Sequence, residues 1–166
     1  MRKSFFLIYL AIIASSCDDH HIMSDTASFE NGAWAINNPV EFDFEPVDTT
    51  SAVDMFVHLR NTDQYEFNNL YLISQIKFPH GKTVTDTLQY MMTDAEGKFL
   101  GSGTRDVYEN KLWLKEGVRF RESGTYNLLL RHAMRKNGEV DGVQNLEGVL
   151  DVGYSIEKQK SEDGNK

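Results

Sequence analysis

The sequence predicts a single all-β domain, an antiparallel β-sandwich of the immunoglobulin-like or jelly-roll type. Three observations predict it: short segments of alternating apolar and polar residues, a spacing of about ten residues between them, and no amphipathic helical period. The chain has 166 residues, 40% of them hydrophobic, which is an ordinary globular composition. A domain of about 150 residues buries roughly two-thirds of its unfolded surface, so we expect it to fold without a disulfide or a metal.

The N-terminus predicts a lipoprotein signal peptide over residues 1–16. A short basic region precedes an apolar run from Phe5 to Ala14, which is too short to span about 30 Å of hydrocarbon. Small residues then precede Cys17, the one cysteine of the chain, and the arrangement resembles the lipobox that bacterial lipoprotein signal peptidase cleaves. We expect diacylglycerol on the Cys17 sulfur and an acyl chain on its amine, because one chain alone anchors only marginally. The alternative is an ordinary secretory signal followed by a free thiol.

The polar residues 17–28 predict a lipidated tether between the anchor and a domain that spans residues 29–157. Two adjacent histidines, His20 and His21, lie in this segment, but neighbouring residues on a flexible chain form no closed metal site. Residues 158–166 contain almost no apolar side chain, and we expect this tail to fray.

The acidic charge of the chain excludes one class of partner. The formal net charge is −8, and cleavage of the signal peptide removes Arg2 and Lys3 but no carboxylate, so the mature chain is more acidic. Nucleic-acid binding relies on Lys and Arg that neutralise phosphates, so we predict no nucleic-acid partner. An acidic domain also gains nothing from an anionic lipid surface, so we expect the lipid alone to hold it at the membrane.

In the first half of the domain, a period of two predicts each strand. Residues 40–45 alternate apolar and acidic side chains until a proline ends the segment. Residues 52–60 repeat the alternation except at Phe56, which predicts partial cover on the polar face. The dense apolar run 70–78 predicts a central strand, and the turn residues after it predict a hairpin with the threonine-rich strand 83–90.

The second half predicts a long loop followed by further strands. Residues 93–111 show neither the helical period nor the alternation of a strand for long. This predicts a structured loop with one helical turn near Val107 and Tyr108. The pairs Asn137-Gly138 and Asp141-Gly142 predict tight turns in a second loop. Strands are predicted at residues 111–114, 117–120, 125–134 and 150–157.

Sequence motifs for catalysis or ligand binding are absent, and we predict no catalytic residue, no cofactor and no metal. Gly97, Gly101 and Gly103 lack the lysine and the strand-to-helix setting of a phosphate loop, so they predict turns. The three histidines beyond residue 29 are scattered. Asp106 and Glu109 could form a glycosidase pair, but an acidic chain contains such pairs by chance.

Aromatic residues offer a surface for a partner protein or a glycan. Most of them are expected in the core or at its edge. Trp113 stands between two leucines, so strand alternation places its side chain on the opposite face, where it can be exposed. We take Trp113 and Tyr108 as the candidate partner or glycan contacts. A wider stacking platform would also draw on Trp34, Tyr65 and Tyr71.

Short motifs spread over the mature chain resemble one known family. In chain order they are Arg60-Asn61, Tyr65, Asn69-Leu70-Tyr71-Leu72, Asp86-Thr87-Leu88, the run from Gly97 to Gly103, Val118-Arg119-Phe120, Ser123-Gly124-Thr125-Tyr126, Ala133-Met134-Arg135 and the run from Gly148 to Gly153. In this order, behind a lipobox, they resemble the gliding-motility lipoprotein family GldH. The chain departs from the family at Phe99, where tryptophan is expected, and at Leu146-Glu147-Gly148, where Leu-Pro-Gly is expected.

The resemblance implies a non-enzymatic lipoprotein of the cell envelope, anchored in the outer membrane and needed for gliding on surfaces. It implies a scaffold or assembly role linked to the secretion machinery that exports motility adhesins, with other envelope motility and secretion proteins as partners. The alternative that the residues leave open is an outer-membrane sandwich lipoprotein that binds glycans.

Overall fold

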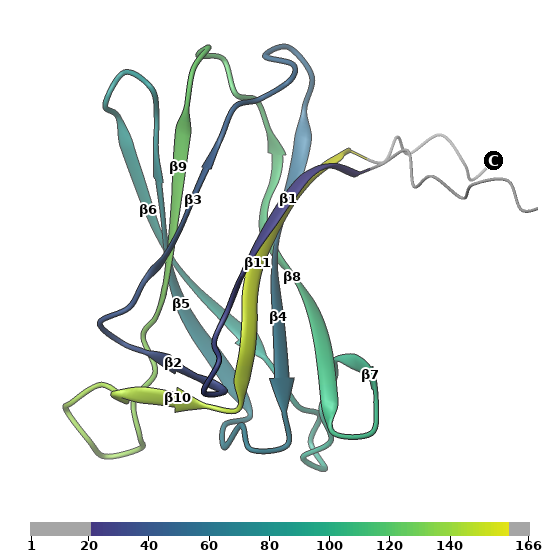
Figure 1. The fold of residues 1–166 in the computed structure, drawn as a ribbon, viewed down its shortest axis with the longest axis vertical. Helices are drawn as coiled ribbons and strands as arrows, with labels where there is room; N and C mark the ends of the chain where they lie inside the picture. The colour runs from purple at the N-terminus through teal and green to yellow at the C-terminus, as the bar shows by residue number, and fades with distance from the viewer. Residues whose placement is uncertain (1–20, 160–166) are drawn as a thin grey trace, which may run out of the picture.

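The computed structural model describes residues 21–159, and this range contains eleven strands and no helix (Figure 1). All strand pairs are antiparallel. The prediction of a single all-β sandwich is therefore confirmed. Predictions for residues 1–20, including Cys17, and for residues 160–166 lie outside the described range.

Two sheets form the layers of the sandwich, and a short third sheet lies at one end (Figure 1). The five-stranded sheet has the order β1 (His21–Ser28), β11 (Val149–Lys158), β4 (Val53–Thr62), β8 (Val107–Val118) and β7 (Ser102–Thr104). The four-stranded sheet has the order β3 (Val40–Phe44), β9 (Tyr126–His132), β5 (Asn69–Lys77) and β6 (Thr83–Met91). The third sheet pairs β2 (Ala33–Ala35) with β10 (Asn145–Glu147).

The core lies between the two large sheets, because their strands alternate apolar and polar residues and turn the apolar set inward. On β11, Val152, Tyr154 and Ile156 are buried, as the alternation predicts. Aromatic rings bridge the layers: the ring centroids of Phe42 and Tyr154 are 5.1 Å apart. Further buried residues from both sheets complete the cluster: Met55, Val57, Leu59, Leu70, Leu72, Leu128 and Leu130.

The β2–β10 sheet covers one end of this core with a tryptophan. The Trp34 side chain is fully buried, and its indole Nε1 donates a hydrogen bond to the carbonyl oxygen of Asn38 at 2.9 Å. Its ring stacks on Phe29 and meets His132 edge-on at 5.4 Å. Trp34 is therefore a core residue and contributes to no surface platform.

The hairpin predicted after the central strand is present. Strands β5 and β6 pair in continuous register from Asn69–Met91 to Lys77–Thr83. In the turn, the amide of Phe78 donates to the carbonyl of Lys82 at 2.7 Å. The alternation on β6 is also as predicted, since its threonines are exposed and Val84, Asp86, Leu88 and Tyr90 are partly covered.

The predicted tether is wrong for residues 21–28, which form strand β1 and pair with β11. The sandwich therefore includes His21–Ser28, which precede the predicted start at Phe29. The segment shows little alternation of apolar residues because β1 is an edge strand with mostly exposed side chains. Lys158, assigned to the frayed tail, is the last residue of β11.

Three further details differ from prediction. The segment 93–111 contains β7 and the start of β8, and Val107 and Tyr108 are strand residues with no helical turn. The strands predicted at 111–114 and 117–120 are one strand, β8, whose pairing with β4 contains a bulge near Leu114 that obscures the alternation. Strands β2 and β10 were missed because three residues are too few to show a period.

Gly148, between β10 and β11, fits a position that other residues cannot occupy without strain. Its φ is +78°, and an added Cβ would lie 2.3 Å from the backbone nitrogen of Tyr65. Its own amide donates to Gly32, and its carbonyl accepts from Thr62, both at 2.8 Å. The backbone of three segments therefore meets at this glycine.

We expect Gly148→Ala to destabilise the domain more than Gly138→Ala. Both glycines have positive φ, but Gly138 has no neighbouring atom within 4 Å, so it reports the conformational strain alone. That strain is worth about 1–2 kcal/mol, and forcing backbones apart adds about 1–3 kcal/mol. Thermal unfolding should show the larger fall in Tm for Gly148→Ala. Equal falls would show that the contact with Tyr65 relaxes at no cost.

Candidate functional site

The candidate site is the outer face of the five-stranded sheet, formed by side chains that point away from the core. On β4 these are Phe56, His58 and Arg60, which pair in register with Trp113, Lys111 and Glu109 of β8. On β11 they are Asp151, Ser155 and Glu157, and on β1 they are Ser24 and Thr26. We call this set the outer face.

An aromatic pair covers one part of the outer face. The rings of Phe56 and Trp113 lie 4.4 Å apart, and Lys111 Nζ lies 4.2 Å from the Phe56 ring centroid. As a result Phe56 is only 7% exposed on a polar face, while Trp113 is 53% exposed. The cover expected over Phe56 and the exposure expected for Trp113 are both present. A cation over an aromatic ring contributes about 0.5–1 kcal/mol at such sites.

A chain of hydrogen bonds occupies the middle of the outer face. His58 Nε2 lies 2.7 Å from Ser155 Oγ, and Ser155 Oγ lies 3.1 Å from Glu157 Oε1. Lys111 Nζ donates to Glu157 Oε2 at 2.7 Å. Burial lowers the pKa of His58, and the charge of Lys111 lowers it further, so the imidazole is neutral at pH 7. Burial alone would raise the pKa of Glu157, but the hydrogen bond and charge of Lys111 outweigh it and lower that pKa.

A hollow of about 590 Å³ lies beside this chain, lined by Thr26, His58, Arg60 and Glu109 among others. Arg60 Nε donates to Asp151 Oδ2 at 2.5 Å, so its charge is compensated. The charges of Arg60 and Lys111 are paired with Asp151 and Glu157, while Glu109 forms no ion pair among the described residues. Such a surface suits polar contacts with another protein better than capture of a small ion.

The outer face contains a serine, a histidine and a glutamate, but not in an arrangement that activates a nucleophile. In a catalytic triad the imidazole lies between the hydroxyl and the carboxylate. Here Ser155 lies between His58 and Glu157, and its side chain is fully buried. Among residues 21–159, no three potential ligands form a metal-binding group.

The two contacts named from the sequence do not form one surface. Tyr108 pairs with Asn61 on the inner side of β4, and its ring packs 4.5 Å from Phe99. Trp113 points to the outer face. Tyr65, which the sequence analysis considered for a wider stacking platform, is buried. Trp113 is therefore an isolated exposed ring supported by Phe56.

The remaining residues that were considered for catalysis or ligand binding do not form a common site. Asp106 lies in the turn between β7 and β8, and Glu109 faces outward opposite Arg60. Gly97 has a φ of +83° in a turn capped by Asp94, as predicted for a turn glycine. The sequence analysis missed the partnership of His58, Lys111 and Glu157, because it depends on strand register.

Comparison with known proteins decides the family. A family model described as GldH lipoprotein matches residues 21–156. The chain belongs to the GldH lipoprotein family. This family places it among the membrane-anchored lipoproteins of the cell envelope, and a role in gliding motility follows from the family.

Two relatives of this GldH family member cover nearly its whole length. A protein of Christiangramia forsetii named gliding motility lipoprotein GldH homolog is 46% identical over 93% of this chain and 94% of its own length. The gliding motility lipoprotein GldH of Flavobacterium johnsoniae is 38% identical over 96% of this chain and 98% of its own length. No solved structure gives a significant match. Within the described part of this family member, no helix has the length and hydropathy to cross a membrane.

We expect Lys111→Gln to raise the pKa of His58. Removing the lysine removes a positive charge that disfavours the imidazolium, and it leaves the Glu157 carboxylate, which favours it, without its cation. NMR titration of the imidazole resonances measures this shift. Lys136→Gln is the matched control, because Lys136 pairs with Glu66 at the other end of the domain. A His58 pKa that is unchanged or lower in Lys111→Gln would contradict the described network.

Proposed function

We propose that this chain is a non-enzymatic scaffold of the gliding-motility apparatus and its associated secretion machinery, anchored in the outer membrane through lipid on Cys17. Membership of the GldH family supports the motility role. The observation that carries the scaffold role is Trp113, an exposed ring fixed on the rigid outer face beside paired charges. In this proposal the outer face contacts another envelope protein.

The composition of the outer face supports a protein partner. Tryptophan and arginine are enriched among the residues that contribute most to protein interfaces, and such residues are surrounded by contacts that exclude water. Trp113 and Arg60 lie on neighbouring strands of one sheet, and both side chains are held in place. A fixed side chain loses little conformational entropy on binding, which favours association.

The non-enzymatic part of the proposal rests on the buried hydroxyl of Ser155. No substrate can reach it without displacing the side chains that cover it, and the imidazole of His58 is already engaged with it. A glycan-binding role is the second candidate, and the exposure of Trp113 is the observation that favours it. Because Phe56 is buried beneath Trp113, the outer face offers one exposed aromatic ring, which is a small stacking surface.

We expect labelled palmitate to be incorporated into the wild-type protein and not into Cys17→Ser. Lipid attachment requires the thiol, and Cys17 is the one cysteine of the chain. Membrane fractionation of the same cells should show the variant soluble or retained with its signal peptide. Equal incorporation into both proteins would exclude Cys17 as the anchor.

We expect Trp113→Ala to impair gliding while the protein accumulates normally. Truncating a central interface tryptophan costs about 2 kcal/mol or more, which is about a thirtyfold loss of partner affinity. The measurement is complementation of a deletion strain, scored by colony spreading and by export of motility adhesins.

Leu100→Ala is the matched control, because Leu100 is similarly exposed, at 58%, and does not belong to the outer face. Co-purification of envelope proteins with the two variants separates the scaffold role from glycan binding. Normal spreading and unchanged co-purification in Trp113→Ala would show that the outer face is not the surface that contacts a partner protein. Loss of saturable glycan binding in that variant would favour the second candidate.

A further inference from the structure

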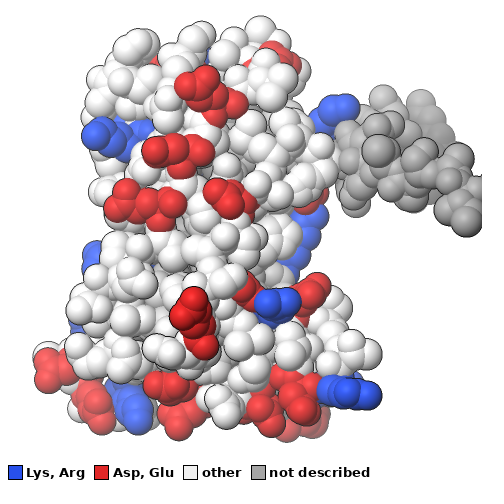
Figure 2. Space-filling model, in the orientation of Figure 1, with Lys and Arg blue, Asp and Glu red and all other residues white. Residues whose placement is uncertain are grey.

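The charged residues of the domain are unevenly distributed: carboxylates are densest at one end, and cations without ion-pair partners in the described range gather at the other. Figure 2 shows many carboxylates along the lower end, where β2, β7 and β10 lie in Figure 1. By chain position, the lower end carries Glu30, Asp63, Glu66, Asp94, Glu96, Asp106, Glu139, Asp141 and Glu147 against Lys98, Arg105, Arg135 and Lys136. The negative charge of the protein is therefore concentrated there.

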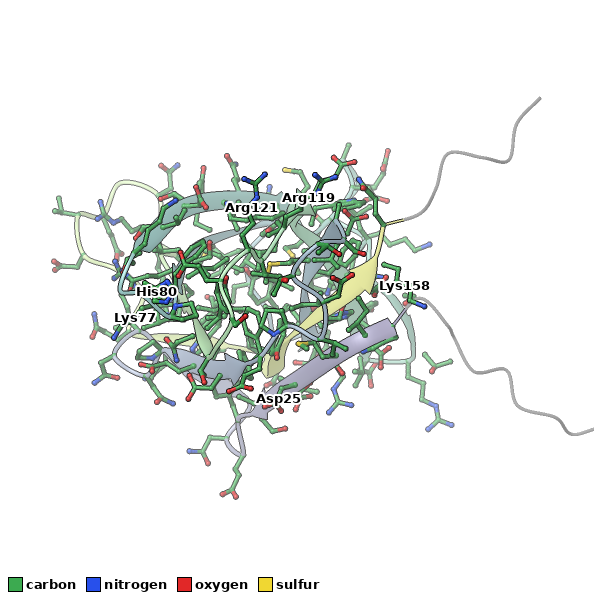
Figure 3. All side chains as sticks on the ribbon, turned by 90° about the horizontal axis from the view of Figure 1, so that it is seen from above. Asp25, Lys77, His80, Arg119, Arg121 and Lys158 are labelled. Carbon is green, nitrogen blue, oxygen red and sulfur yellow. The ribbon has the colours of Figure 1, made fainter. Side chains whose placement is uncertain are left out.

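The opposite end carries five exposed cations. We call it the upper end: the β3–β4 loop, the β5–β6 turn, the β8–β9 loop and the last residues of β11. Figure 3 looks onto it from above, with Lys77, Arg119, Arg121 and Lys158 around its rim. Lys82 is the fifth. Within residues 21–159, none of the five takes part in an ion pair.

The carboxylates of the upper end are mostly held by local partners. Asp48 accepts hydrogen bonds from Thr50 and Ser51 in its own loop, and these bonds lower its pKa. Glu45 accepts from Thr125 Oγ1 at 2.9 Å, and Glu122 pairs with His80 at 3.0 Å. At the neighbouring strand ends, Asp43 accepts from Asn127 Nδ2, Asp54 accepts from the Gly117 amide and Glu157 accepts from Lys111 Nζ. Glu116 is exposed. These carboxylates keep their negative charge, but most of their oxygens are occupied by local donors, whereas the five cations form no ion pair among the described residues.

The upper end also carries an exposed apolar side chain. Val47, next to Pro46 in the β3–β4 loop, is 82% exposed. It borders a hollow of about 400 Å³ that Ile22, Phe120 and Ile156 also line. Because Ile22 lies in the first strand, the chain enters the sandwich beside this hollow. Exposed apolar and cationic side chains on one surface are typical of contact with a lipid interface.

Chain length brings the upper end close to the proposed anchor. Cys17 precedes His21 by four residues, and four residues span at most about 14 Å. The lower end is farther from the anchor by the length of the sandwich, since a strand of ten residues such as β4 is about 33 Å long. That distance exceeds the Debye length of about 10 Å at 0.1 M salt, so the distant carboxylates are screened from the membrane.

We propose that the upper end lies against an anionic lipid surface, with Lys77, Lys82, Arg119, Arg121 and Lys158 at the headgroups and Val47 at the interface. The inference rests on the proposed lipid at Cys17, which holds the domain within reach of the bilayer. It differs from the expectation, drawn from net charge alone, that an acidic domain gains nothing from anionic lipid. The acidic lower end then points away from the membrane.

Two single-cysteine variants of the full, lipid-modified chain test the orientation. Val47→Cys places a thiol on the upper end, and Val140→Cys places one at a matched site, 84% exposed, on the segment between β9 and β10. Lipid on Cys17 blocks the native thiol, so each new cysteine is labelled uniquely with a fluorophore. The proteins are reconstituted into vesicles that contain a headgroup nitroxide quencher and either phosphatidylcholine with phosphatidylglycerol or phosphatidylcholine alone.

We expect quenching at position 47 in phosphatidylglycerol vesicles, with much less at position 140 and a decrease on adding salt. Arg119→Gln with Arg121→Gln in the Val47→Cys protein should lower the ratio of docked to undocked domain about tenfold or more, since each cation near an anionic surface favours docking. Arg131→Gln with Arg135→Gln removes two exposed arginines that lie away from the upper end, and should change nothing.

Equal quenching at positions 47 and 140, or quenching that does not depend on phosphatidylglycerol, would overturn the proposal. Protection of position 47 that requires an added protein, with no quenching by lipid, would assign the upper end to an acidic protein partner instead. Failure of the anchor is distinguished by the wild-type protein, whose Cys17 would then react with the fluorophore and incorporate no palmitate.

Discussion

The aromatic cluster between the sheets is the constraint on which the other features depend. The ring of Tyr126 lies 5.6 Å from that of Phe44 and 4.9 Å from that of Phe120. Each buried aromatic side chain removes about 150–250 Å² from water, so these rings are among the largest favourable contributions in the domain. The Tyr126 hydroxyl donates to the carbonyl of Glu122 at 3.1 Å. The core thereby fixes the β8–β9 loop, which carries Arg119 and Arg121.

The apolar interior also determines what the outer face can be. A strand that turns alternate residues inward must present the others outward, and a slip of one residue would exchange the two sets. Asn110 resists such a slip between β4 and β8, because its buried Nδ2 donates to Asn61 Oδ1 at 2.8 Å and to the Leu59 carbonyl at 3.1 Å. An unpaired buried amide would cost about 1–3 kcal/mol. The register that aligns His58 with Lys111 is thus maintained from inside the sandwich.

Segments with a clear period of two could be predicted from the sequence, and segments without one could not. Strands β3, β5 and β6 were found because each has one face on the core and one turned outward. Strand β1 was missed because an edge strand with exposed side chains needs no apolar face. The exposure of Trp113 followed from its leucine neighbours. The stacking of Phe56 on Trp113 could not be predicted from the sequence, because a bulge in the β4–β8 pair determines which residues lie opposite each other.

The net charge of the chain says little about its binding surfaces, because the topology of the strands determines where the charged residues lie. Turns at alternate ends of an antiparallel sandwich collect residues that are far apart in sequence, and here they bring Lys77 and Arg121 to one end and Glu66 and Glu147 to the other. If the upper end faces the membrane, the strands stand upright on it and the outer face points sideways. Trp113 would then meet partners that diffuse in the same membrane, where confinement to two dimensions raises the effective concentration. A weak interface on the outer face would suffice for assembly under that geometry.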